Sequence, residues 1–144
     1  MTNTAKFDLL DFLPYLMTQS ADALSLEFQP AYKDRYGMLR TEWRVLFHVG
    51  RYKDITAKEI CDRARLHKTK VSRAVTALEQ KNLLARAERQ EDRRHASLTL
   101  TAEGQAVFRD LTQEARAFNE KIKTQLGSED AATLQRILTQ IADL

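Results

Sequence analysis

The stretch from residue 66 to 80 constrains the fold of this chain most, because its pattern suits a helix with two unlike sides. Four apolar residues recur at helical spacing and share one side: Val71, Ala74, Val75 and Leu78. The opposite side is polar and cationic, with Thr69, Arg73, Thr76 and Gln80 flanked by Lys70 and Ser72. This side lacks the alternating Glu and Lys that are typical of a helix face exposed only to water. The pattern predicts a helix that buries one side and presents a cationic side outward.

A shorter helix precedes this one. Thr56 and Glu59 have the spacing of a capping box, which predicts a helix from residue 56 to about Ala64. Residues 65–67 then form a short turn. Two short helices joined in this way, the second with a cationic outer side, are typical of a helix-turn-helix that reads DNA.

Two strands follow the cationic helix. Asn82 suits the left-handed backbone conformation that ends a helix. Strand-like segments cover residues 83–89 and 95–100, with residues 90–94 as a charge-dense loop. A hairpin in this position predicts a winged helix-turn-helix.

Long helices flank this lobe. The first covers about residues 7–35, with Asp11 as its cap and Pro14 in its first turn. Pro30 predicts a bend or break near Gln29. The apolar face of this helix is broader than one packing stripe needs, which predicts an assembly surface.

The remaining helices lie on either side of the winged lobe. One covers about residues 40–50, where Gly50 suits the position that ends a helix. Residues 51–55 then form a short connection. Thr101 caps a helix after the wing, Gly127 helps to end it, and Ser128 caps a last helix rich in Leu and Ile. That last helix is a second candidate assembly surface.

The basic charge gathers in one segment. The 144-residue chain has a net charge of +3, but residues 63–95 hold ten Lys or Arg and four acidic residues. This segment therefore carries +6, and the rest of the chain carries −3. Such a distribution is expected of a local phosphate-binding surface. A solvated basic face without a partner is the alternative.

Composition excludes several classes of protein. No apolar run approaches the ~20 residues that span a bilayer, and no signal segment is evident, so we expect a cytoplasmic protein. The single cysteine, Cys61, excludes an internal disulfide framework and a multi-cysteine zinc site, and we expect it to be a half-buried thiol. The three histidines lack metal-ligand spacing, and no nucleophile or phosphate-loop motif occurs. We therefore expect no enzyme activity, no metal and no cofactor.

Three motifs, in this order, resemble the MarR family of bacterial transcription regulators across nearly the whole chain. Residues 37–46 (GMLRTEWRVL) are similar to the opening of the family's second helix, although Leu39 stands where the family often has a capping Thr. Residues 55–84 are similar to its helix-turn-helix. Residues 92–94 (DRR), followed by Thr-x-x-Gly at 101–104, are similar to its wing signature.

This resemblance implies a mainly α fold with a small β-hairpin wing. Residues 1–144 then form one MarR-like domain, with a winged helix-turn-helix lobe at 38–100 and dimerisation helices at 1–36 and 101–144. It further implies a homodimer on a palindromic double-stranded operator. Transcription is usually repressed until a small ligand, often an anionic aromatic, or an oxidant releases the protein.

The DNA-binding candidates lie on the recognition helix and the wing: His67, Lys68, Thr69, Lys70, Ser72, Arg73, Thr76, Arg86, Arg89, Asp92, Arg93 and Arg94. Arg73 is the best candidate for reading a base, because a guanidinium can bind guanine O6 and N7 together. Lys70 can do the same or bind phosphate, and the short hydroxyl residues can donate to phosphate. Arg94 at the wing tip suits the narrow minor groove, and Asp92 can hold it by an ion pair, as in the family.

Two alternatives remain open. A winged helix can bind protein instead of DNA, and a small hydrolase or redox enzyme is the other class. The cationic outer side disfavours the first, and the lack of an assembled nucleophile, base and orienting group disfavours the second. Tyr15, Trp43 and Arg44 could line an effector pocket, although core packing explains the two aromatic residues better.

Overall fold

The computed structural model describes residues 6–89 and 92–144, the side chains of 88, 89 and 92–95 excepted. Its helices are η1 (Leu9–Asp11), α1 (Leu13–Tyr36), α2 (Arg40–Arg51), α3 (Ala57–Ala64), α4 (Lys68–Gln80), α5 (Ala102–Leu126) and α6 (Ser128–Ala142). Its strands are β1 (Ile55–Thr56), β2 (Leu84–Arg89) and β3 (Asp92–Leu100). The predicted fold class, mainly α with a small wing, is confirmed.

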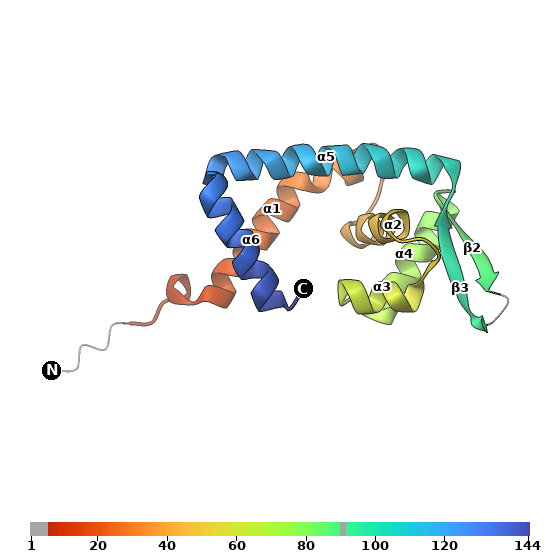
Figure 1. The fold of residues 1–144 in the computed structure, drawn as a ribbon, viewed down its shortest axis with the longest axis horizontal. Coiled ribbons are helices and arrows are strands. Elements are labelled where there is room, and N and C mark those ends of the chain that lie inside the picture. Colours follow the sequence, from red (N-terminus) through yellow and green to blue (C-terminus); the bar gives the residue numbers. More distant parts are fainter. Residues whose placement is uncertain (1–5, 90–91) are drawn as a thin grey trace.

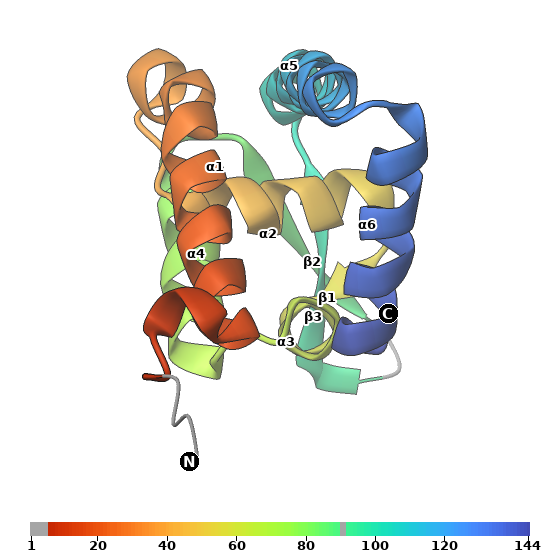
Figure 2. The ribbon, with the colours of Figure 1, turned by 90° about the vertical axis from the view of Figure 1, so that its left-hand side faces the viewer.

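The elements form a compact lobe at one end of the long helix α5 and an open pair of helices at the other (Figure 1). Helices α2, α3 and α4 and the sheet lie beneath one end of α5, and α6 turns back from its other end. Helices α1 and α6 overlap in Figure 1 but stand apart in Figure 2. Among the described residues, no helix is long and apolar enough to cross a membrane.

A single core joins the lobe to the flanking helices. Its largest fully buried members come from α1, the α1–α2 corner, α5 and the elements of the lobe: Tyr32, Met38, Leu46, Ile55, Ile60, Leu78, Leu98 and Leu111. The predicted apolar stripe of α4 is confirmed, since Val71, Ala74, Val75 and Leu78 are all buried. Burial of this stripe fixes which side of α4 faces outward.

The sheet has the order β1-β3-β2, and both pairings are antiparallel. Residues 51–55 were expected to form only a connection, but Ile55 begins a strand and pairs with Leu98. Residues 90–94 were expected to form a loop, but the strand backbone of β3 already begins at Asp92. Pairing with β2 extends this strand beyond what its own alternation predicts.

Several helix ends differ from the sequence prediction. The N-cap of α1 is Phe12 rather than Asp11, whose side chain instead accepts the Asp8 N–H in η1. Pro14 does lie in the first turn. Helix α1 continues through Pro30 without a break, so packing against its neighbours outweighs the one missing N–H donor.

Two glycine boundaries are also corrected. Gly50 lies inside α2, and a Cβ there would come within 2.4 Å of the Phe108 ring, so this glycine serves the close approach of α5. The cap of α6 is Gly127, at φ +89°, rather than Ser128, which is the first helical residue. The predicted caps Thr56 and Thr101 are confirmed, and each side chain accepts an N–H from three residues later.

Candidate nucleic-acid interface and effector cleft

The outer side of α4 is exposed from its cap onward. The seven candidates on it all have exposed side chains: His67, Lys68, Thr69, Lys70, Ser72, Arg73 and Thr76. His67 is also the N-cap of α4, since its Nδ1 accepts the Thr69 N–H at 3.2 Å. The first turn of α4, which presents its N–H groups outward, carries Lys68 and Lys70 and no acidic residue. This surface attracts anions.

Helix α4 ends in a tight motif. Asn82 adopts the predicted left-handed conformation at φ +59°, and the Leu83 N–H returns to the Leu78 carbonyl at 3.0 Å. The cap residue Lys81 donates to Glu42 Oε1 at 2.6 Å and to the Gly37 carbonyl at 3.0 Å. Lys81 therefore holds the end of the recognition helix against the α1–α2 corner.

Glu42 is a structural residue that the sequence analysis missed. It is 4% exposed, and its second oxygen accepts the Leu39 N–H at 3.2 Å, which completes the start of α2. Leu39 itself supplies no side-chain cap. This role could have been predicted, because a glutamate in the first turn of a helix without a capping hydroxyl can accept the N–H of the N-cap residue.

The wing is only partly described. Arg86 is exposed, and its Nε donates to Glu79 Oε1 at 2.7 Å, so an acidic neighbour already compensates its charge. The side chains of Arg89, Asp92, Arg93 and Arg94 lie outside the described residues. Their predicted roles therefore stay predictions, although the backbone of Arg89 pairs with that of Asp92.

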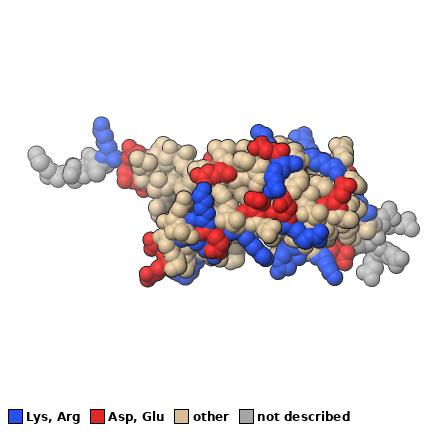
Figure 3. All heavy atoms as spheres, turned by 90° about the horizontal axis from the view of Figure 1, so that it is seen from above, with Lys and Arg blue, Asp and Glu red and all other residues tan. Residues whose placement is uncertain are grey.

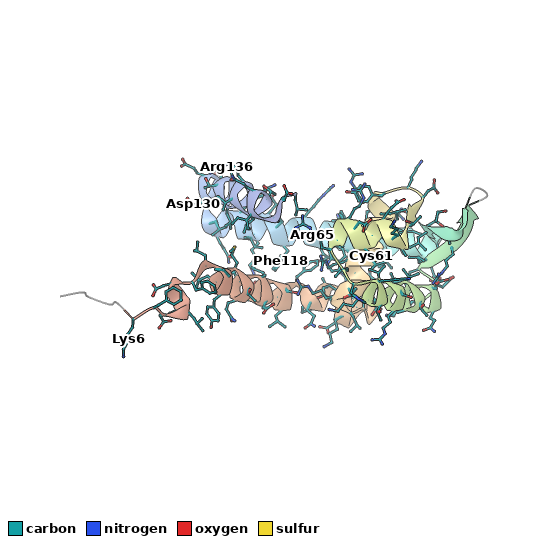
Figure 4. The ribbon with its side chains drawn as sticks, turned by 90° about the horizontal axis from the view of Figure 1, so that it is seen from below. Lys6, Cys61, Arg65, Phe118, Asp130 and Arg136 are labelled. Carbon is teal, nitrogen blue, oxygen red and sulfur yellow. The ribbon has the colours of Figure 1, made fainter. Side chains whose placement is uncertain are left out.

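A cavity of about 460 Å³ lies between α3, α4 and β2. Its lining includes Cys61, which is half-buried as expected, with Lys68, Ser72 and Arg86. Cys61 is labelled in Figure 4 beside α3. In the described part of the chain, no three His, Cys, Asp or Glu residues gather as a metal-binding group.

A larger cleft, of about 810 Å³, lies between the lobe and the long helices α1 and α5. Its walls are largely aromatic: Phe28, Tyr32, Trp43, Phe47, Phe108 and Phe118. These rings contact one another in a chain, with centroids 5.4 Å apart for Phe28 and Phe118 and 5.5 Å apart for Phe28 and Trp43. Figure 4 shows Phe118 between α1 and α5.

The charged residues of this cleft are all cationic: Arg40, Arg44, Arg51 and Arg116. No carboxylate among the described residues forms an ion pair with Arg44. Burial lowers the pKa of the Arg44 guanidinium, and the nearby charge of Arg40 lowers it further. A half-buried guanidinium without a carboxylate partner is stabilised when an anion binds beside it.

Arg44 also joins the cleft to the helix-turn-helix. Its Nη2 donates to the Ala64 carbonyl at 3.2 Å, at the last residue of α3. The next residue, Arg65, adopts the left-handed conformation that starts the turn before α4. One guanidinium therefore lies in the cleft and also contacts the end of α3, next to the turn before α4.

Three residues were considered for a pocket from the sequence, although core packing was preferred for the two aromatic ones. Trp43 and Arg44 line the cleft, whereas Tyr15 does not. The contribution of α5 was missed, including Thr112, whose buried Oγ1 has no hydrogen-bond partner. Only the packing of α5 across α1 and α2 brings that helix to the cleft, and no local pattern indicates such a crossing.

Comparison with known proteins agrees with this architecture. The chain is 22% identical to the HTH-type transcriptional regulator FarR of Neisseria gonorrhoeae, over 89% of this chain and 87% of FarR. It is 25% identical to the homoprotocatechuate degradative operon repressor of Escherichia coli, over 93% of this chain and 90% of that protein.

Solved structures share the fold from end to end. A MarR/EmrR family transcriptional regulator from Acinetobacter sp. ADP1 matches with a TM-score of 0.84 and 23% identity, over 95% of this chain and 96% of that one. NadR in complex with 4-hydroxyphenylacetate matches with a TM-score of 0.78 and 22% identity, over 100% of this chain and 99% of that one. Streptococcus pneumoniae FabT in complex with DNA matches with a TM-score of 0.76 and 23% identity, over 94% of this chain and 96% of that one.

The model of the MarR family matches residues 36–95, which span the α1–α2 corner, the helix-turn-helix and most of the wing. The motifs at 37–46, 55–84 and 92–94 fall within this segment, whereas Thr-x-x-Gly at 101–104 lies beyond it, at the start of α5. Relatives that are transcriptional regulators align with this chain well beyond the matched segment. Over residues 36–95 the chain therefore matches the MarR family, and its overall fold is that of the solved MarR/EmrR family regulator from Acinetobacter.

Proposed function

We propose that this protein is a sequence-specific, double-stranded DNA-binding transcriptional repressor, not an enzyme, that works in the cytoplasm. The observation that carries this proposal is the exposed cationic side of α4, held outward by the buried stripe on its other side. The structure of FabT with DNA supports the same role for this fold. The top face in Figure 3 mixes acidic and basic side chains, so it offers no comparable surface.

In this proposal α4 enters the major groove. Arg73 reads a guanine, Lys70 binds a base or a phosphate, and the flanking polar groups bind the backbone: His67, Lys68, Thr69, Ser72 and Thr76. Arg93 and Arg94 of the wing reach the minor groove, with Asp92 steadying Arg94. Arg86 and Arg89 are weaker phosphate contacts, and the ion pair of Arg86 with Glu79 supports that ranking.

We propose that the terminal helices form a homodimer, which places two lobes on a palindromic operator. The apolar side of α6 is exposed in the single chain, with Leu134 43%, Leu138 41% and Ile141 60% exposed. Phe7 and Leu10, before α1, are 72% and 68% exposed. Apolar groups gathered at one end of the molecule in this way support an interface between two copies.

The DNA contact is tested with duplexes that the protein selects from a random-sequence pool. Arg73→Ala should relax the preference at one base pair, by about 5- to 150-fold for a lost bidentate contact. Arg136→Ala removes an exposed cation of α6, far from α4 (Figure 4), and should leave binding unchanged. Fluorescence anisotropy measures both variants. Equal weakening on every sequence would show that Arg73 binds phosphate, and unchanged affinity would refute the assignment.

We further propose that an aromatic carboxylate releases the repressor by binding in the cleft between α1, α2 and α5. The aromatic walls suit the ring, and the half-buried Arg44 suits the carboxylate. The fold relative NadR, solved with 4-hydroxyphenylacetate, supports this class of ligand. A carboxylate on Arg44 competes with the Ala64 carbonyl, which couples the cleft to the turn before α4.

Benzoate serves as the minimal probe of this cleft. It should raise the melting temperature of the protein, because it binds the native state selectively. It should also lower the affinity for the selected duplex. Arg44→Met keeps the aliphatic stem but removes the charge, so it should abolish both effects, whereas Arg136→Ala should keep them. Equal responses of wild type and Arg44→Met would refute this site.

A further inference from the structure

Thr112, in the middle of α5, has a buried hydroxyl without a hydrogen-bond partner. Four helical hydroxyls in this chain bond to the carbonyl four residues earlier, at 2.7–2.9 Å: those of Thr18, Ser20, Thr124 and Thr139. The Oγ1 of Thr112 is buried and has no such bond. It is the one buried side-chain nitrogen or oxygen without a partner in the described part of the chain.

This hydroxyl belongs to the wall of the effector cleft. Thr112 lines the cleft one turn from Phe108, whose ring packs against Phe47 with centroids 5.6 Å apart. The next turn carries Arg116, also in the lining. Thr112 therefore lines the same cleft as the aromatic rings and the cationic groups, where an aromatic acid would bind.

Burying an unpartnered hydroxyl costs free energy, and a ligand that supplies a partner recovers it. A helical threonine populates two side-chain rotamers, so rotation about Cα–Cβ can exchange the methyl and hydroxyl positions. A hydroxyl both donates and accepts, so it can pair with a phenol on a ligand ring. A site built to bond a ligand hydroxyl discriminates strongly against the analogue that lacks it.

We propose that Thr112 is a specificity-determining residue of the effector cleft. It selects aromatic acids that carry a ring hydroxyl over the unsubstituted acids. The proposal rests on the proposed function of the cleft: Arg44 takes the carboxylate, and Thr112 takes the second polar group. No sequence pattern indicates this role, because an isolated threonine in a long helix has no distinctive surroundings.

The test measures the affinity of the full-length protein for benzoate and for its 2-, 3- and 4-hydroxy isomers by calorimetry. Wild type should bind one isomer about 10-fold more tightly than benzoate, which is about 1.4 kcal/mol. Thr112→Val has nearly the same shape but no hydroxyl. It should bind benzoate as wild type does and lose the preference, whereas Thr112→Ser should keep it.

Each outcome is decisive. The proposal is overturned if Thr112→Val keeps the preference, or if wild type prefers no isomer while it binds benzoate through Arg44. If neither benzoate nor any isomer binds wild type, the aromatic-acid function of the cleft fails and this inference fails with it. Folding is controlled by the melting temperature, which should not fall in Thr112→Val because the substitution removes an unpartnered buried hydroxyl.

Discussion

The junction between the wing and α5 should tolerate no side chain at Gly104. A Cβ at this position would lie 1.9 Å from the Leu83 carbonyl oxygen, where real contacts stay above 3.0 Å. That oxygen cannot turn away freely, because it accepts the Thr101 N–H at 3.1 Å. Gly104→Ala must therefore push the two backbone segments apart by about 1 Å.

The expected cost follows from these contacts. Overpacking of this kind costs roughly 1–3 kcal/mol, and loss of the Thr101 cap, which accepts the Gly104 N–H at 3.0 Å, adds about 1 kcal/mol. The higher helix propensity of alanine returns up to about 1 kcal/mol. Because a 1.9 Å approach is a severe clash, the upper overpacking value applies, and the cap and propensity contributions cancel, so we expect a net loss of about 3 kcal/mol in the free energy of unfolding. The melting temperature should fall by about 6–12 °C.

Two other glycines provide matched controls. At Gly50 a Cβ meets only the Phe108 ring, a side chain that can shift, so Gly50→Ala should cost about 1 kcal/mol. At Gly37 a Cβ meets nothing within 4 Å, but φ is +64°, so Gly37→Ala should also cost about 1 kcal/mol. Urea unfolding at one protein concentration compares the three variants. A Gly104→Ala variant no less stable than Gly37→Ala would refute this reasoning.

Three further predictions concern contacts that hold the helices together. In a double-mutant cycle of Glu42→Gln and Lys81→Met, urea unfolding should give a coupling of about 1–3 kcal/mol, and a coupling near zero would show that the ion pair does not act as a unit. Burial and a hydrogen bond to Asp110 raise the pKa of Tyr36. The stabilisation that the neutral phenol gives the folded protein is therefore present below pH 10.0 and is lost as the pH rises above that value. Tyr36→Phe should flatten this alkaline loss in pH-dependent melting, and an unchanged profile would argue against it. Leu138→Glu should shift the protein from dimer to monomer in analytical ultracentrifugation, because it places a charge on the exposed apolar side of α6, and an intact dimer would locate the interface elsewhere.

Periodicity predicted the elements that carry their own pattern. The buried stripe of α4, the caps at Thr56 and Thr101 and the left-handed Asn82 all depend on neighbours within a few residues. Strand β1 was missed because two residues form it only by pairing with β3. Of the bend or break predicted near Gln29, the break is wrong, because the local penalty at Pro30 was outweighed by packing that the local sequence does not reveal.

The same distinction separates the two sites. The exposed recognition surface lies on one helix, so its seven residues could be named from spacing alone. The cleft is assembled from three helices, and its polar groups become significant only through burial. Arg44 and Glu42 are two residues apart in the sequence. Arg44 lines the cleft and has no carboxylate partner among the described residues, whereas Glu42 accepts a hydrogen bond from Lys81. No spacing rule predicts that difference.

The close approach of Gly104 to the Leu83 carbonyl joins the start of α5 to the residue before β2, at the base of the wing. A helix of 25 residues is about 37 Å long, so in the proposed dimer α5 would connect the interface at one end to the wing at the other. A rotation of about 5° at the far end carries the wing by about 3 Å, close to the rise of one base pair. Small changes in how two copies pack would therefore decide whether both wings fall in register with the same operator.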